Sequence, residues 1–253
     1  MKRLLLLGGM TPDVTVLYYN AINRVVRSAL GGRNNAPLYM YSANLEDMIQ
    51  FAGAGNWDAF AKVYIDAIDS VRDKIDGVVV CAILAHKVSR QLSDALSSPA
   101  GSTGDHGAPK FLHIADYLAK HIKTAHPHIH TLGLLGPKVT MLGSDDPDFF
   151  IGRLQAAGNE FKVLVPDTEA DMEDVNRGML EEVAKGASAV TAETKAMFVR
   201  NARALVSRGA QAIILGSTDL GFVVRQEDLG DDVVVIEPAS VHAEEVARWA
   251  LES

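Results

Sequence analysis

The stretch that decides the fold is Leu4-Leu5-Leu6-Leu7-Gly8-Gly9-Met10-Thr11-Pro12-Asp13-Val14-Thr15. Four consecutive leucines without polar alternation are typical of a strand covered on both faces of a sheet. The two glycines let the backbone turn sharply and approach a ligand closely, and the residues after them indicate the N-terminus of a helix. The segment before them begins Met1-Lys2-Arg3, but its apolar run is too short for a signal peptide. We therefore predict a buried first strand, a tight turn and a helix.

The rest of the chain repeats this strand pattern in two series of four. Further apolar runs lie at 38–41, 77–84 and 111–114, and a second series lies at 132–135, 161–165, 212–215 and 233–236. A helical pattern precedes the third run of each series, at 57–71 and at 193–207. Alternation of buried strands and helices favours parallel sheets with right-handed crossovers. The prediction is an α/β fold of two similar lobes, each a mostly parallel four-stranded sheet flanked by helices.

The domain organisation that we expect follows from the two series. The first α/β lobe comprises 1–116 and 222–253, and the second comprises 117–221. The C-terminal helix, from about Val241, returns to the first lobe.

Composition excludes several classes of protein. The chain has 253 residues, 48% of them hydrophobic, and a formal net charge of −8. An excess of acidic residues argues against a nucleic-acid partner, and no apolar run reaches the roughly 18 residues of a membrane span. Its only cysteine is Cys81, so a disulfide framework and a Cys-rich zinc site are excluded. We expect a cytoplasmic protein with a small-molecule substrate, and a homodimer is a candidate assembly.

The informative residues follow the strands, because parallel sheets bind ligands beyond the carboxyl ends of their strands. These segments carry the candidate substrate-binding residues Met10, Thr11, Thr15, Asn44, Ala82, Ile83, Leu84, Lys87 and Thr218. They also carry the candidate catalytic residues Ser217, His86, His242, Asp219 and Glu237. The segments lack the dinucleotide fingerprint, the Gly-rich lysine loop and metal-ligand spacing, so we expect no cofactor and no metal.

His86 and His242 are the strongest candidates for proton transfer. Each follows a predicted strand, and an imidazole titrates near pH 6.5, which suits acid–base chemistry at neutral pH. A structural histidine or a helix cap would produce the same sequence, and both interpretations stay open at this point.

The same segments resemble the aspartate/glutamate racemase superfamily. The matches are Gly8, Gly9, Met10 and Thr15 in the first loop, Cys81, His86 and Lys87 in the third, and Gly216, Thr218, His242 and Ala243 later. The resemblance covers nearly the whole chain. It implies two pseudo-symmetric lobes with the active site between them, and cofactor-independent deprotonation and reprotonation at a carbon next to a carboxylate.

The chain departs from the family where the family places its two thiols. Those positions align with Ala82 and Ser217, so neither holds a cysteine. Cys81 precedes the first position by one residue, and neighbouring residues of a strand point to opposite faces, which favours a buried structural cysteine. The polar pair that the resemblance would place after the first thiol is Ile83-Leu84, so the pocket should be more apolar than one for aspartate.

Three hypotheses follow. The first is an enzyme on the racemase scaffold that carries out isomerase, lyase or cyclase chemistry beside a carbonyl or carboxylate, with Ser217 and Thr218 as hydrogen-bond donors. The second is a non-catalytic binding protein derived from a racemase. The third is an aspartate or glutamate racemase that uses bases other than cysteine.

Overall fold

The chain forms two α/β units. The computed structural model describes residues 1–97 and 107–252, without the side chains of Ala187 and Thr218. The first unit comprises Met1–Tyr117 together with Ala239–Ser253, and the second comprises Leu118–Pro238. The chain therefore returns from the second unit to the first after Pro238, whereas the sequence predicts this boundary between residues 221 and 222. The difference arises because the last strand pairs within the second sheet, so that residues 222–238 stay with the second unit.

Each unit contains one four-stranded sheet, and all described strand pairs are parallel. The first sheet has the order β2-β1-β3-β4 and the second the order β6-β5-β7-β8. The strands are β1 (Leu4–Gly8), β2 (Leu38–Ser42), β3 (Gly77–Val80), β4 (Lys110–Leu112), β5 (Thr131–Leu135), β6 (Lys162–Leu164), β7 (Ala212–Leu215) and β8 (Val234–Ile236). Every predicted strand is present, so the predicted fold class is confirmed.

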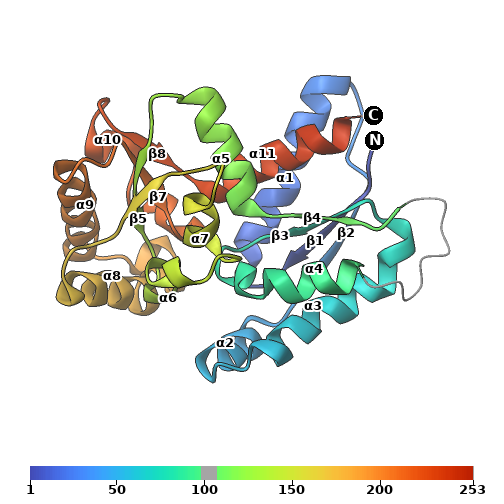
Figure 1. Cartoon of the computed structure of the whole chain (residues 1–253), viewed down its shortest axis with the longest axis horizontal. Coiled ribbons are helices and arrows are strands. Elements are labelled where there is room, and N and C mark those ends of the chain that lie inside the picture. The colour runs from blue at the N-terminus through green and yellow to red at the C-terminus, as the bar shows by residue number, and fades with distance from the viewer. Residues whose placement is uncertain (98–106, 253) are drawn as a thin grey trace. The chain divides into compact units, whose positions relative to one another are not determined.

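Helices cover both faces of the first sheet (Figure 1). Its helices are α1 (Pro12–Leu30), α2 (Leu45–Gly53), α3 (Trp57–Val71), α4 (Ser89–Ser97) and most of α11 (Pro238–Leu251). Leu5 and Leu7 face the core shared with α3 and α4, whereas Leu4 and Leu6 face α1 and α11. The run of leucines is thus buried on both sides, as its lack of polar alternation predicts.

The second unit repeats the arrangement. Its helices are α5 (Ile114–Ala125, which begins in the first unit), α6 (Lys138–Met141), α7 (Phe150–Gln155), α8 (Glu169–Glu181), α9 (Ala192–Ser207) and α10 (Gln226–Leu229). Helices α8 and α9 share a core with Leu135, Ile213 and Leu215 of the sheet. Side chains of Asn56 and Thr191 cap α3 and α9, the helices that precede the third strand of each sheet.

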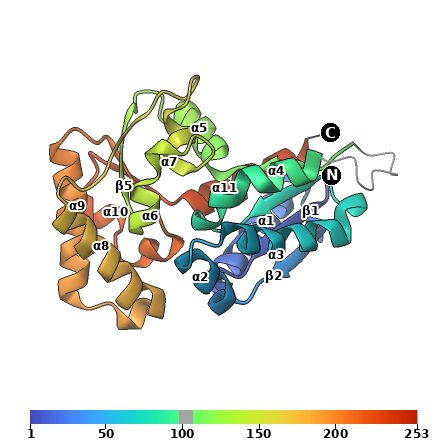
Figure 2. The ribbon, with the colours of Figure 1, turned by 60° about the horizontal axis from the view of Figure 1, so that its bottom comes forward.

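Two strands of the structure differ from the strands that the sequence predicts. The third run ends as a strand at Val80 rather than at Leu84, because the chain leaves the sheet and forms a 3₁₀ turn at Leu84–Val88. The second run is expected to be buried on both faces, but β2 lies at the edge of its sheet (Figure 2). The last four residues of β2 are exposed. An apolar run indicates a strand but does not show whether a neighbour covers it.

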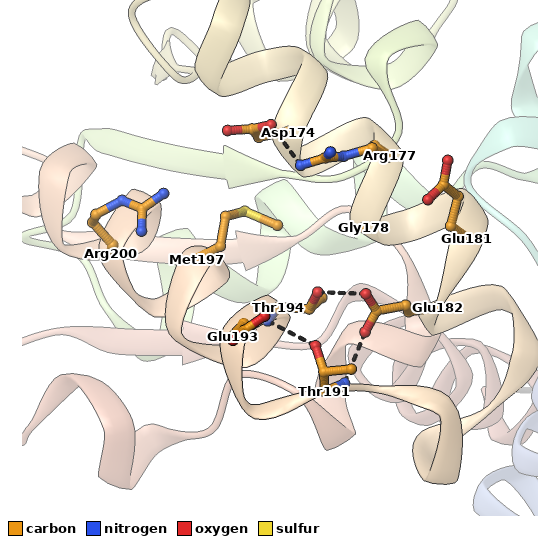
Figure 3. Close-up of a pocket in the computed structure, with 10 residues that line it drawn as sticks. All are labelled: Asp174, Arg177, Gly178, Glu181, Glu182, Thr191, Glu193, Thr194, Met197 and Arg200. Carbon is orange, nitrogen blue, oxygen red and sulfur yellow. Dashed lines mark hydrogen bonds and ion pairs between the residues drawn. The ribbon is translucent and has the colours of Figure 1, made fainter.

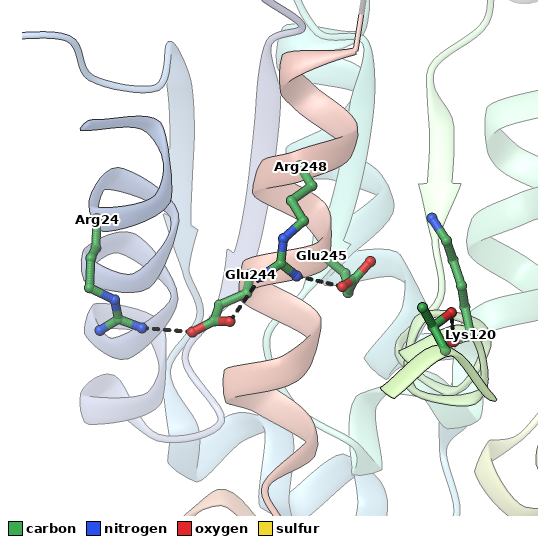
Figure 4. A network of polar contacts seen from close by, with 6 residues as sticks. Arg24, Lys120, Glu244, Glu245 and Arg248 are labelled. Atoms are coloured by element: carbon green, nitrogen blue, oxygen red, sulfur yellow. Dashed lines mark hydrogen bonds and ion pairs between the residues drawn. The ribbon is translucent and has the colours of Figure 1, made fainter. Parts of the chain in front are cut away.

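Ion pairs join α11 to α1 on the surface of the first unit. The Arg24 guanidinium lies 3.0 Å from the Glu244 carboxylate, and Arg248 contacts both Glu244 and Glu245 (Figure 4). Exposed pairs of this kind contribute little to stability, so the apolar core under α11 holds the helix in place. In the described part of the chain, no helix is long and apolar enough to cross a membrane.

Candidate functional site

The third strands of the two sheets end in the same way. The N–H of Cys81 donates to the carbonyl of Leu7 (2.9 Å), and the N–H of Gly216 donates to the carbonyl of Leu135 (2.6 Å). Residues Ala82 and Ser217 follow directly, and each precedes a 3₁₀ turn, at Leu84–Val88 and Thr218–Phe222. Ala82 and Ser217 therefore occupy equivalent positions in the two units.

The first loop makes close contacts that only glycine allows. Gly9 has φ +99°, and a Cβ there would lie 2.3 Å from the backbone N and O of Ala43. A Cβ on Gly8 would lie 2.2 Å from Oγ1 of Thr15. Thr15 itself is buried, and its hydroxyl accepts from the Gly9 N–H and donates to the Thr11 carbonyl. Thr15 thus shapes the loop, and its hydroxyl is already used there.

The other candidate binding residues of the first unit differ in exposure. Met10 and Thr11 are half-buried at the start of α1, and Asn44 is exposed just before α2. Ile83 is buried, while Ala82, Leu84 and Lys87 are half-buried. The end of β3 therefore presents a methyl group and apolar side chains where the family resemblance implies a thiol and polar groups.

Cys81 is a core residue, as predicted. It packs among Leu4, Leu6 and Val79 on the α1 and α11 face, whereas Ala82 packs against the opposite core. Burial raises the pKa of the Cys81 thiol well above its usual value, so the reactive thiolate is not formed at neutral pH.

His86 is buried and uses both ring nitrogens within the first unit. Its Nε2 accepts a hydrogen bond from the N–H of Ile114 (3.2 Å), at the start of α5. The ring proton therefore lies on Nδ1, which donates to the Ala82 carbonyl (2.9 Å). The ring also packs edge-on against His113, with 4.5 Å between centroids. His86 therefore caps a helix and fixes the turn after β3.

His242 is buried in the same core. Its Nε2 lies 3.0 Å from the Leu112 carbonyl, to which it donates, and its Nδ1 accepts from the Tyr18 hydroxyl at 2.9 Å. Burial, together with nearby His86, lowers the pKa of His242 well below 6.5, although the bond to Leu112 opposes the shift. Burial also raises the pKa of Tyr18 well above 10, so this hydroxyl remains a donor.

These contacts bear on the expected roles of the two histidines. His86 and His242 were predicted as catalytic acids or bases, but both are fully buried and bound to backbone or tyrosine groups of their own unit. The geometry favours the structural alternative for both. Sequence reasoning missed Tyr18 and His113 as their partners, because those contacts join segments up to 224 residues apart.

The second unit holds the remaining candidate catalytic residues. Ser217 has an extended backbone and is half-buried at the end of β7, and Asp219 is half-buried in the turn that follows. Glu237 is exposed after β8, and a Cβ built on Gly221 would lie 2.8 Å from its Oε1. The carboxylate of Glu237 therefore lies against the same turn as Asp219. The side chain of Thr218, a predicted donor, lies outside the described part of the structure.

A separate hollow of about 380 Å³ lies between α8 and α9 (Figure 3). Glu182 accepts from the Thr191 N–H and from the Thr194 hydroxyl, and these bonds lower its pKa. Arg177 pairs with Asp174 at 2.8 Å. These five polar residues of the hollow thus bond to one another, and none of them was a candidate site residue from the sequence. Among the described residues, no three His, Cys, Asp or Glu side chains are placed to hold a metal ion.

Comparisons with known proteins agree with the fold. The model of the Asp/Glu/Hydantoin racemase family matches residues 7–246. A structure from Yersinia pestis assigned to the Asp/Glu racemases is 31% identical, covers 100% of both chains and has a TM-score of 0.84. An aspartate racemase homologue from Pyrococcus horikoshii OT3 is 24% identical over 100% of both chains (TM-score 0.74). Picrophilus torridus aspartate racemase is 14% identical over 99% of this chain and 94% of its own (TM-score 0.67).

Proposed function

Because the chain belongs to the Asp/Glu/hydantoin racemase family, we propose that it is an enzyme that uses this scaffold for proton transfer beside a carbonyl or carboxylate. The proposed chemistry is that of an isomerase, lyase or cyclase, requires no cofactor and acts on a small molecule less polar than aspartate. The observation that carries the proposal is the equivalence of Ala82 and Ser217 at the ends of β3 and β7.

This equivalence supports proton transfer on one face only. Racemisation needs a base on one face of the carbon and an acid on the other. Ala82 supplies neither, and the nearest histidine of that loop, His86, is engaged by backbone groups. The second unit retains Ser217, Asp219 and Glu237 near one turn. A carboxylate can move a proton there, while the Ser217 hydroxyl donates to a developing oxyanion.

The residues beside Ala82 support the substrate class. Ile83 and Leu84 offer no hydrogen bond to a second carboxylate, and leaving such a group unpaired is costly. An acid with an alkyl or aryl substituent at the reacting carbon fits these side chains better.

The cytoplasmic location expected from the sequence stays a prediction.

A binding protein is the second candidate function, and the two buried histidines favour it. Hydrogen bonds within the first unit account for the burial of both His86 and His242, so their presence does not require catalysis. Racemisation of aspartate or glutamate by bases other than cysteine is the third hypothesis, and the same experiment tests it.

The test is deuterium uptake from heavy water, followed by NMR in the presence of a chelator. The probes are L-aspartate, L-glutamate and a panel of carboxylic acids with alkyl or aryl groups at the α-carbon. We expect exchange, decarboxylation or isomerisation only in the apolar panel. Ser217→Ala should lower this rate about 10²- to 10³-fold, because one oxyanion donor is lost. Ser207→Ala, which removes an exposed hydroxyl of α9, should leave it unchanged.

The other outcomes separate the hypotheses. Rapid exchange into aspartate or glutamate by the unmodified protein would establish the racemase hypothesis instead. If no probe exchanges but the apolar acids raise the melting temperature, the protein is a binding protein. Exchange into aspartate only in Ala82→Cys/Ser217→Cys would show that the scaffold has lost its thiol chemistry.

A further inference from the structure

The hollow between α8 and α9 has the size of a small-molecule site. Its volume of about 380 Å³ lies within the range of roughly 300–1,000 Å³ that is usual for such sites. Its wall includes Gly178 and the half-buried Met197, and a Cβ built on Gly178 would lie 2.9 Å from the Met197 Cε. The middle of the hollow is therefore narrow and lined by an apolar side chain. None of the described residues that line it belongs to the turn of Ser217, Asp219 and Glu237.

The charged side chains of this hollow are ordered by sign along the helices. Glu182, directly after α8, accepts from the Thr194 hydroxyl in the first turn of α9, so the end of α8 lies beside the start of α9. The two helices therefore run in opposite directions. Figure 3 shows Arg200 at one end of the hollow, and Glu181 with Glu182 at the other. Arg200 follows Glu193 by seven residues on α9, which is about 10 Å along the helix axis.

The basic end of the hollow offers a guanidinium group to a ligand. Arg177 pairs with Asp174 at 2.8 Å, but Arg200 is exposed and forms no hydrogen bond or ion pair with any other described residue. A guanidinium group binds a carboxylate through two parallel N–H donors. Asp174 uses Oδ1 for Arg177, which leaves its Oδ2 for a cationic group. This end therefore suits a carboxylate that has an ammonium group beside it.

The acidic end has an excess of negative charge. Glu182 is already bonded to two threonines, and these bonds, together with the charge of Lys185, lower its pKa. Glu181 and Glu193 are exposed, and within the described part of the chain their side chains form no hydrogen bond or ion pair. Carboxylates of this kind bind an ammonium group through charge-assisted hydrogen bonds.

We propose that this hollow is a binding site for a basic amino acid of the lysine type. The ligand's carboxylate bonds to Arg200, and its α-ammonium group bonds to Asp174. Its alkyl chain lies along Met197, and its terminal ammonium group bonds to Glu181 and Glu193. A dicarboxylate would leave one acid group among the glutamates, and a diamine would leave one ammonium group at the arginine. The order of the charges thus selects a ligand with opposite charges at its two ends.

Isothermal titration calorimetry of the full chain with L-lysine at low ionic strength tests the site. Exposed ion pairs are individually weak and are screened by salt, so we expect a dissociation constant on the order of 1 mM. L-Norleucine lacks the terminal ammonium group and cadaverine lacks the carboxylate. Each should bind at least about tenfold more weakly than L-lysine, because one charged group of the site loses its partner.

Three variants assign the binding to this hollow. Arg200→Gln and Glu181→Gln should each raise the dissociation constant for L-lysine about tenfold, because each removes one charged partner. Arg90→Gln should leave it unchanged, since Arg90 is an exposed arginine on α4 of the first unit. All three side chains are exposed, so the melting temperatures of the variants should match that of the wild type.

A reversal of charge gives a readout that does not depend on losing affinity. In Arg200→Glu both ends of the hollow are acidic, so cadaverine should bind more tightly than L-lysine. The absence of L-lysine binding, equal wild-type affinities for the two ligands, or a preference that Arg200→Glu does not change would overturn the proposal. So would binding that survives both Arg200→Gln and Glu181→Gln, because L-lysine would then bind elsewhere. These outcomes are independent of any exchange reaction at Ser217.

Discussion

At the scale of the residue, His242 makes the stability of the first unit depend on pH. Its pKa is lowered well below 6.5 in the folded protein, mainly by burial. Below pH 6.5 the unfolded chain therefore binds a proton that the folded chain does not, and the free energy of unfolding falls as the pH falls. We expect His242 to contribute a loss of up to about 1.4 kcal/mol per pH unit below that point.

Urea unfolding at several pH values from 7.5 to 5 measures this effect. His242→Gln keeps a donor and an acceptor for Leu112 and Tyr18 but does not titrate, so its stability should fall less steeply with pH. His128→Gln, which replaces an exposed histidine, should follow the wild type. Identical slopes for wild type and His242→Gln would contradict the assignment of this proton to His242.

At the scale of the element, the turn between β1 and α1 depends on Gly9. Its positive φ and its approach to the Ala43 backbone leave no room for a Cβ, so Gly9→Ala must move the loop that carries Met10 and Thr11. We expect a loss of at least about 3 kcal/mol in the free energy of unfolding, from backbone strain together with overpacking.

Gly55→Ala is the matched control for this turn. Gly55 also has a positive φ (+67°), but a Cβ there would meet nothing within 4 Å. The substitution should cost only about 1 kcal/mol, which reflects the strain alone. Equal losses for the two variants in denaturant titrations would show that the contact with Ala43 is unimportant.

At the scale of the whole molecule, the first unit is completed by the last residues of the chain. Helix α11 buries Ala243, Val246 and Ala247 against Leu4 and Leu6. A chain that ends at Pro238 should therefore expose this core, and we expect rapid proteolysis within residues 1–117. A chain that ends at Leu251 keeps the core and should stay within about 1 kcal/mol of the wild type. Protease resistance of the shorter chain would show that α11 is dispensable.

Much of the fold could be predicted because it depends on local patterns. The eight apolar runs, the helix at Trp57–Val71 and the turn at Gly8-Gly9 each reflect the chemistry of neighbouring residues. The positions of Ala82 and Ser217 followed from the repeated order of strands. The unit to which residues 222–238 belong was harder to predict, because only the pairing of β8 with β7 assigns them to the second unit.

By itself, the sequence of this protein determined the two parallel sheets and the absence of a cysteine at positions 82 and 217, since both follow from residue type and order. Only the tertiary structure decided which groups the two histidines contact. His86 bonds to Ile114, and His242 bonds to Leu112 and Tyr18. It also decided that β2 is exposed while the equally apolar β1 is buried. Burial and hydrogen-bond partners depend on which distant segments come together, and a local pattern does not contain that information.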